Sequence, residues 1–207
     1  MTFKLINIPP ARMLMALAAG TLMASSAYAE SPRSVDARTL DIAGVKTGMD
    51  YDQALTAVAK HFGVPQDQIK QAPLMGENPV TKTKLHNYFV YEKDGVSLTV
   101  HFEPRVPVDT SRPQAVSQVI YEIPWSKDNS QRMAQAALEK YGVQSNAPND
   151  LPFQWCGQPN ANPGMGCSMP QQPMLELSQV KMRLTDPTWG QARIKFMQDA
   201  QAVKPSF

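Results

Sequence analysis

The segment 87–103 most constrains the fold, because apolar and polar residues alternate on both sides of an Asp94-Gly95 pair. Asp-Gly between two alternating runs is a strong signal for a two-residue β-hairpin turn. A turn at these residues pairs Lys93 with Val96. In that register the large apolar residues share one face of the hairpin: Phe89, Tyr91, Leu98, Val100 and Phe102. The segment therefore predicts a hairpin with one face in the core.

A helix is expected to precede this hairpin, at 50–62. Asp50 can cap it and Gln53 can complete a capping box, while Gly63 and Pro65 supply the stop. A third strand is expected at 117–123, after a proline-rich loop at 104–113. These elements form a first unit, residues 30–125.

A second unit, residues 126–207, repeats this order. A helix at 129–141 ends at Gly142, strands are expected at 153–156 and in 174–184 with a turn near Ser178-Gln179, and a last helix follows Asp186. The two helix ends, 57–64 and 136–143, match in character. That match has two readings, an internal repeat or chance. The predicted fold class is α+β, with helices packed on a mainly antiparallel sheet.

The first unit also carries a family resemblance. Gly48-Met49-Asp50 opens a helix that ends in Phe62-Gly63-Val64-Pro65 and leads into a hairpin and another strand. This pattern resembles the helix-plus-sheet unit of the SmpA/OmlA outer-membrane-assembly lipoproteins and, in tandem, the β-lactamase inhibitor proteins. The chain departs from the pattern in lacking a lipidated cysteine and in having no Gly-Met before the second helix. The resemblance implies a protein-binding fold without chemistry of its own.

Residues 1–29 have the order of a cleavable Sec signal peptide. Lys4 and Arg12 precede an apolar run, and Ala27-Tyr28-Ala29 supplies a small-x-small cleavage site before Glu30. The apolar run is too short for a transmembrane helix, which needs about 20 residues. We therefore expect cleavage between Ala29 and Glu30, a periplasmic or secreted location and no transmembrane segment in the mature chain.

The charge balance argues against nucleic acid as a partner. The whole chain has 20 basic and 18 acidic residues, and the two basic residues within 1–29 are lost with the signal peptide. The mature chain is therefore formally neutral and has no basic run. Nucleic-acid binding requires a basic surface, so nucleic acid is not expected as a partner. The resemblance and the expected periplasmic location imply another envelope protein as the partner.

Cys156 and Cys167 are the only cysteines, and an exported protein with two cysteines is expected to join them in a disulfide. Closing a loop of this length stabilises the fold by about 3 kcal/mol in the chain-entropy description. The alternative is a Cu(I) site, because Met165, Met169 and Met174 place further soft sulfur near the cysteines. A disulfide would consume the thiolates that such a site needs.

The hairpin register creates a second candidate site. It places His86 opposite Glu103 and His101 opposite Tyr88, all on the face away from the core. Two imidazoles and a carboxylate could hold Zn²⁺ or act as acid and base. The alternative is an ordinary polar sheet face that contacts a partner through Tyr88 and His101. Trp125 follows Pro124 at a strand end, and we expect it to be an exposed partner contact.

No catalytic or cofactor motif was found, so neither catalytic residues nor a cofactor is assigned. The sequence favours a non-catalytic periplasmic binding protein that uses a sheet face or the Cys156–Cys167 loop. A periplasmic copper or zinc protein is the first alternative. A small secreted hydrolase with an unrecognised site is the second.

Overall fold

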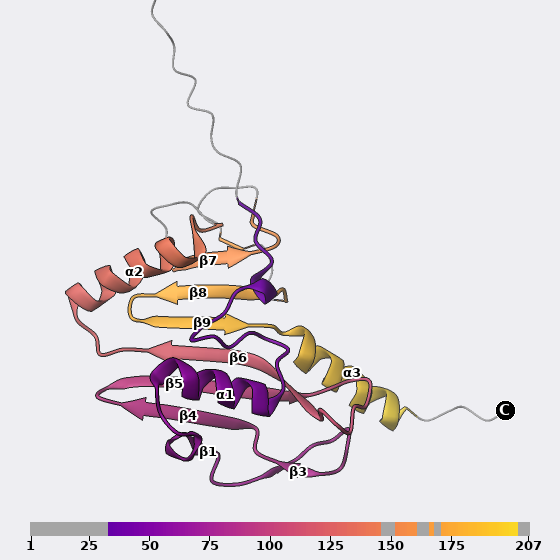
Figure 1. Cartoon of the computed structure of the whole chain (residues 1–207). Coiled ribbons are helices and arrows are strands. Elements are labelled where there is room, and N and C mark those ends of the chain that lie inside the picture. The colour runs from indigo at the N-terminus through magenta and orange to yellow at the C-terminus, as the bar shows by residue number, and fades with distance from the viewer. Residues whose placement is uncertain (1–32, 146–151, 161–165, 168–170, 203–207) are drawn as a thin grey trace, which may run out of the picture. The chain divides into compact units, whose positions relative to one another are not determined.

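A computed structural model of the chain describes residues 33–145, 152–160, 166–167 and 171–202 (Figure 1). The predicted signal peptide, residues 1–29, and its Ala29–Glu30 cleavage site lie outside the described residues. Residues 31–207 form one compact unit. None of its described helices is long and apolar enough to cross a bilayer.

The unit is built on an antiparallel sheet of seven strands in the order β1-β4-β5-β6-β9-β8-β7. The strands are β1 (Lys70–Gln71), β4 (Tyr88–Lys93), β5 (Val96–Pro104), β6 (Gln114–Glu122), β7 (Phe153–Cys156), β8 (Met174–Ser178) and β9 (Lys181–Thr185). A two-stranded ribbon, β2 (Gly76–Glu77) with β3 (Lys84–Leu85), lies apart from this sheet. The helices are η1 (Ala37–Thr39), α1 (Tyr51–Phe62), η2 (Gln66–Gln68), α2 (Lys127–Tyr141) and α3 (Thr188–Gln201). The predicted α+β class is confirmed.

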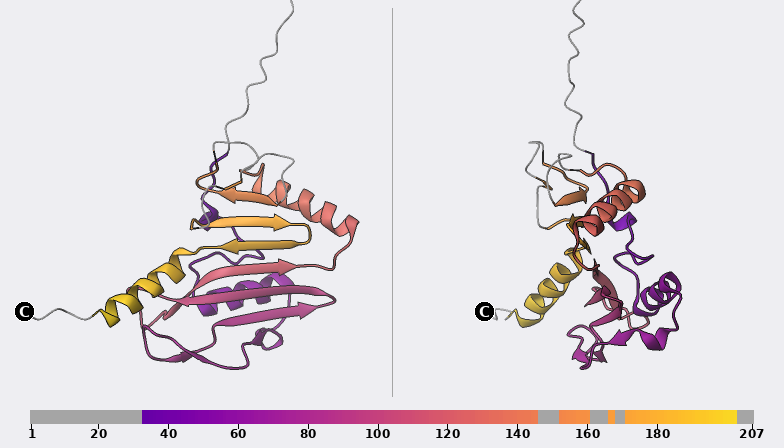
Figure 2. Two further views of the ribbon diagram at one scale, coloured as in Figure 1. Left: turned by 180° about the vertical axis from the view of Figure 1, so that it is seen from behind. Right: turned by 90° about the vertical axis from the view of Figure 1, so that its left-hand side faces the viewer.

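Helices α1 and α2 lie on one face of the sheet and α3 lies on the other (Figure 2). Residues Ala54, Leu55 and Val58 of α1 and Met133 and Ala137 of α2 are buried in the core. The sheet contributes alternate residues to it, among them Phe89, Val100, Val119, Leu175, Leu184 and Trp155. The larger core therefore lies between the sheet and the first two helices.

The hairpin register is confirmed, since Lys93 pairs with Val96, Tyr91 with Leu98 and Phe89 with Val100. Asp94 and Gly95 both have positive φ, 52° and 78°, as a primed hairpin turn requires. Helix α1 also begins as predicted. The Asp50 carboxylate accepts a hydrogen bond from the Gln53 backbone N–H at 2.8 Å, and the Gln53 side-chain oxygen accepts one from the Asp50 backbone N–H.

The second unit differs from its prediction in detail. Helix α2 begins two residues earlier than expected, because the Ser126 hydroxyl accepts from the Asn129 N–H and caps it. Leu138, a large apolar residue of α2, is 37% exposed. The expected turn near Gln179 is confirmed, with φ of 55° at that residue. Both units contribute to one sheet through the β6–β9 pairing. Whether they are a true repeat stays a prediction.

Candidate binding face

The sheet face opposite α1 and α2 carries a polar row nearest the hairpin turns, Glu92, Ser97, Glu122, Lys181 and Ser178, and two further rows of cross-strand neighbours. One row runs Val90, Thr99, Ile120, Arg183, Glu176 and Gln154 across β4, β5, β6, β9, β8 and β7. The other row runs Tyr88, His101, Gln118, Thr185, Met174 and Cys156 across the same strands. We call these two rows the open sheet face, because α3 covers only one end of this side of the sheet (Figure 2).

Helix α3 is fixed to that end by two contacts. Arg193 Nε donates to Glu103 Oε2 at 2.7 Å, and Glu103 pairs with the fully buried Ala115 in the sheet. The Arg105 guanidinium lies 5.3 Å from the ring centroid of Trp189. Both contacts lie at the C-terminal end of β5, so α3 leaves the middle of strands β4, β5 and β6 uncovered (Figure 2).

The half of the open sheet face on β4, β5 and β6 is the less polar half. Six residues of the two rows lie on these strands; one of them is the polar Gln118, and the other five we call the β4–β6 patch: Tyr88, Val90, Thr99, His101 and Ile120. All five are partly buried by their neighbours in the sheet and remain partly accessible. A solvated antiparallel face is ordinarily polar, so two aliphatic residues and two rings in adjacent positions are unusual for it.

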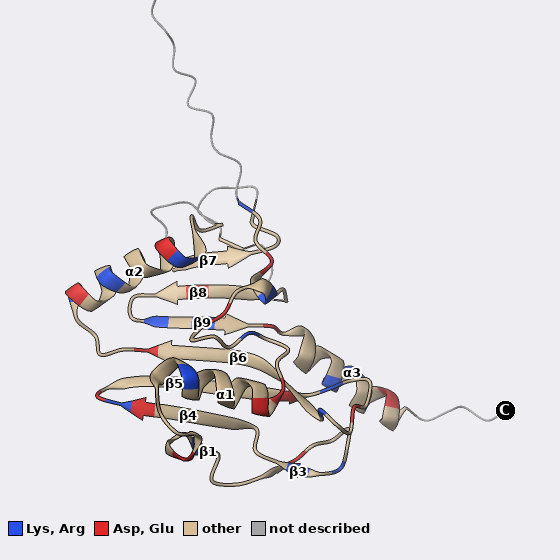
Figure 3. Ribbon diagram, in the orientation of Figure 1, with Lys and Arg blue, Asp and Glu red and all other residues tan. Residues whose placement is uncertain are grey.

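The rest of this side of the sheet, which includes Gln118 and Glu122 of β6, is held by polar pairs. Gln118 Nε2 donates to Thr185 Oγ1 at 3.1 Å, and Gln154 Nε2 donates to Glu176 Oε2 at 3.2 Å. At the strand ends Lys181 pairs with Glu122 at 2.9 Å. Charges of both signs are scattered over the unit (Figure 3). The β4–β6 patch is therefore an apolar area bordered by mutually neutralised polar groups.

Within the patch, Tyr88 and His101 are cross-strand partners, and their ring centroids lie 5.7 Å apart. Burial lowers the pKa of His101 below its ordinary value, because the imidazolium form loses hydration there. The imidazole is thus held neutral at pH 7, when it can both donate and accept a hydrogen bond. The predicted neighbourhood of Tyr88 and His101 is confirmed.

The other two residues of the predicted zinc site, His86 and Glu103, make contacts with other groups. His86 Nδ1 lies 2.9 Å from the Ala72 carbonyl oxygen, and the Glu103 carboxylate binds Arg193. Within the described part of the chain, His86, His101 and Glu103 do not form a metal-binding cluster, and neither does any other group of three or more His, Cys, Asp and Glu residues.

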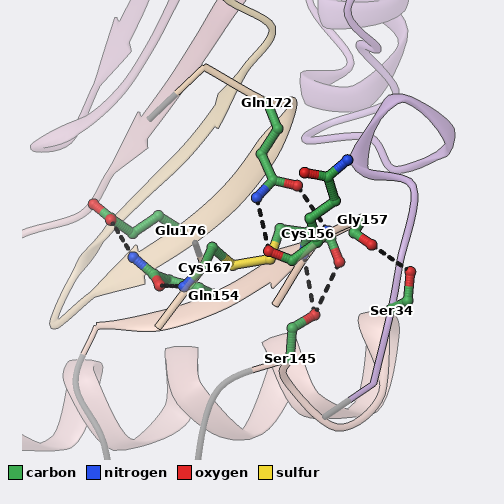
Figure 4. The surroundings of a disulfide bond; sticks show 9 residues. Ser34, Ser145, Gln154, Cys156, Gly157, Cys167, Gln172 and Glu176 are labelled. Atoms are coloured by element: carbon green, nitrogen blue, oxygen red, sulfur yellow. Dashed lines mark hydrogen bonds between the residues drawn. A yellow bond between two sulfur atoms is a disulfide. The ribbon is translucent and has the colours of Figure 1, made fainter. Parts of the chain in front are cut away.

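The predicted Cys156–Cys167 disulfide is confirmed, with the two Cα atoms 6.2 Å apart (Figure 4). Gln154 Oε1 accepts from the Cys167 N–H at 2.8 Å, and the Ser145 hydroxyl bonds both the N–H and the carbonyl of Cys156. Both thiolates of the alternative copper site are consumed by this bond. Met165 and Met169 lie outside the described residues.

Trp125 is 69% exposed, as expected. It lies beyond the end of β6, next to Pro124, which approaches Gly95 of the hairpin turn. Tyr88 and His101 are at the opposite end of the same hairpin. The structure therefore does not bring Trp125 together with the other two predicted contact residues.

Sequence reasoning missed Val90, Thr99 and Ile120 as members of this face. The signal was present for β4 and β5, because the register that buries Phe89 and Val100 turns Val90 and Thr99 outward. Ile120 needed the β5–β6 register, and that contains an irregularity between His101 and Phe102 which the sequence does not announce.

Comparisons of the chain with protein-family models, with curated proteins and with solved structures found no match. The resemblance to SmpA/OmlA and β-lactamase inhibitor proteins stays a prediction.

Proposed function

We propose that this chain is a non-catalytic binding protein of the bacterial periplasm or of the secreted fraction, and that another envelope protein docks on its open sheet face. The observation that carries the proposal is the β4–β6 patch. Val90, Thr99 and Ile120 are adjacent in three neighbouring strands and lack the helix that covers the corresponding residues on the opposite face.

The composition of the patch suits a protein partner. Aromatic side chains and partly apolar surface concentrate at the centres of interfaces, and charged residues are depleted there. The polar pairs Gln118–Thr185 and Gln154–Glu176 lie beside the patch and would form a hydrated rim. Seated on strands rather than loops, the five side chains lose little conformational freedom when a partner binds.

The disulfide supports the proposed compartment. A bond between Cys156 and Cys167 forms and persists in an oxidising environment such as the periplasm or the extracellular space. The neutral mature composition supports a protein partner over a nucleic acid.

The proposal is tested by placing a charge in the patch. Ile120→Glu and Val90→Glu should each weaken partner binding by roughly tenfold or more, as for a central contact residue. Gln131→Glu, at an exposed position of α2 on the opposite side of the sheet, is the matched control. Binding is measured by quantitative co-purification after chemical crosslinking of intact cells, with urea unfolding to show that each variant is folded. Equal loss in all three variants, or in none, contradicts the proposal.

A further inference from the structure

A cleft lined by other residues than those of the open sheet face lies beneath the β2–β3 ribbon. It consists of two adjoining pockets of about 460 and 430 Å³, which share Leu85 and Gln114 as wall residues. The first pocket is bordered by the N-terminal turn of α1, and the second by α3. Each pocket has the size of a small-molecule site.

Gln114 is the residue that distinguishes this cleft from an ordinary surface hollow. It is only 7% exposed, yet its side-chain amide makes no hydrogen bond with any other described residue. Without a partner in the described protein, both the donor and the acceptor of this amide are left for solvent or for a ligand in the cleft.

The Gln114 amide keeps access to the cleft. Among the described residues, the fully enclosed side-chain atoms without a partner are Thr47 Oγ1, Tyr51 Oη, Arg105 Nε and Trp189 Nε1, and the Gln114 amide is not one of them. The surface that Gln114 retains therefore lies toward the two pockets it lines. Its backbone lies at the start of β6, opposite Pro104 of β5.

His86 contributes a second polar group with a defined direction of hydrogen bonding. A carbonyl oxygen can only accept, so the 2.9 Å contact with Ala72 assigns the proton to Nδ1. In the neutral ring Nε2 is then an acceptor. The apolar part of the first pocket comes from Met75, Leu85 and Pro113.

The charges around the cleft compensate one another. Asp50 and Asp52 oppose Lys84 and Arg112 in the first pocket. Asp50 is engaged in the helix cap, and Arg112 donates to Asp109 at 3.2 Å. In the second pocket Glu103 is paired with Arg193. A ligand with a net charge would find no unpaired buried charge of opposite sign here.

We propose that this cleft binds an uncharged ligand with a carboxamide group and an apolar body, held through the amide of Gln114. A glutamine side chain donates and accepts at adjacent atoms, so it can form a pair of hydrogen bonds with another amide. His86 Nε2 would accept from a further N–H of the ligand. The apolar body would lie against Leu85, Met75 and Pro113.

The test uses N-acetyl-leucinamide as the probe, titrated into the mature protein and followed by two-dimensional NMR. We expect saturable binding near the millimolar range for a ligand of this size. The shifts should concentrate on the Gln114 side-chain NH₂ and on Leu85. N-acetyl-leucine and leucinamide, which carry a negative and a positive charge, should bind more weakly.

Two variants locate the site. Gln114→Leu should weaken binding by roughly tenfold or more, since it keeps the volume and removes the hydrogen bonds. Gln118→Leu, on the open sheet face, should leave the affinity unchanged. Met75→Trp changes a 54% exposed wall residue and should block the first pocket without altering a buried position. No saturable binding, equal affinity for all three probes, or full affinity in either Gln114→Leu or Met75→Trp overturns the proposal.

Discussion

The half of the sheet that follows α1 and the half that follows α2 each contain three consecutive antiparallel strands, but these strands differ in length. Strands β4, β5 and β6 have 6, 9 and 9 residues, whereas β7, β8 and β9 have 4, 5 and 5. The first half has an aromatic cluster in its core, in which Tyr51 contacts Phe89 and Phe102 and Phe62 stacks on Tyr91 at 4.0 Å. The second half has a smaller aromatic group, in which Trp155 contacts Tyr141 and Phe153, and the disulfide. Burial of large side chains thus stabilises the long strands of the first half, and the covalent link adds stability to the short strands of the second half.

The outer edges of the two halves are protected in different ways as well. Strand β1 pairs with β4, whereas β7 has no strand on its outer side among the described residues. There the Ser145 N–H donates to the Gln154 carbonyl at 2.6 Å and the Val35 N–H donates to the Cys156 carbonyl at 2.8 Å. Isolated backbone hydrogen bonds thus take the place of a neighbouring strand at β7. This matters because an unpaired strand edge can pair with another chain and cause aggregation.

The largest expected effect concerns whether the halves unfold together. Phe89→Ala should lower the free energy of unfolding by about 4 kcal/mol and Leu175→Ala by about 3 kcal/mol, because each leaves a cavity at a fully buried site. Since one core cluster includes residues of both halves, we expect a single urea transition by fluorescence and by circular dichroism in both variants. Two separate transitions would show that the halves are independent domains.

Removing the disulfide should act mainly on the second half. Cys156→Ser with Cys167→Ser is expected to cost about 3 kcal/mol of global stability through the entropy of the unfolded chain. Native-state hydrogen exchange should also quicken more in β7 and β8 than in β4 and β5, because the bond lies next to the outer strand. An equal increase of the exchange rate in all strands would mean that the disulfide acts only through the entropy of the unfolded chain.

The helix caps provide a smaller comparison. Asp50→Ala removes one arm of a reciprocal capping box, and Ser126→Ala removes a single bond. We expect losses of about 1.5 and about 1 kcal/mol in urea unfolding. If Ser126→Ala cost more than Asp50→Ala, α2 rather than α1 would be the helix that depends on its cap.

The smallest effect is a dependence on pH that belongs to the first half, where all three histidines lie. Burial lowers the pKa of His101 from its ordinary value of 6.5. The unfolded chain therefore binds the proton first as the pH falls below about 6.5. Stability should be complete above that pH, decline below it and level off beneath the folded-state pKa. His101→Gln should flatten this part of the urea-midpoint profile, and an unchanged profile would assign the effect elsewhere.

Local signals predicted the first half well. The Asp94-Gly95 turn, the Asp50–Gln53 box and the Gly63 stop each depend on a few adjacent residues, and all were found. The end of α2 was harder to predict, since Leu138 has helical spacing but falls outside the area covered by the sheet.

The candidate sites depend on contacts between distant residues. Glu103 meets Arg193 across ninety positions of sequence, and this contact decides which end of the open sheet face α3 covers. Gln114 and Leu85 come together only because the β2–β3 ribbon folds over the end of the sheet. Spacing within one element carries no information on such contacts, so the sequence predicted Tyr88 and His101 but neither the β4–β6 patch nor the cleft.

The open sheet face is tested most directly by a photo-crosslinking residue placed at Thr99 in living cells, with Gln131 as the matched position on α2. Thr99 lies between Val90 and Ile120 at the centre of the β4–β6 patch. A docked partner should give a discrete crosslinked product from position 99. An excess of protein without the photo-crosslinking residue should reduce the amount of this product by competition, and position 131 should give no product. Products from position 131 alone, or equal products from both positions, would contradict the assignment of this face as the binding surface.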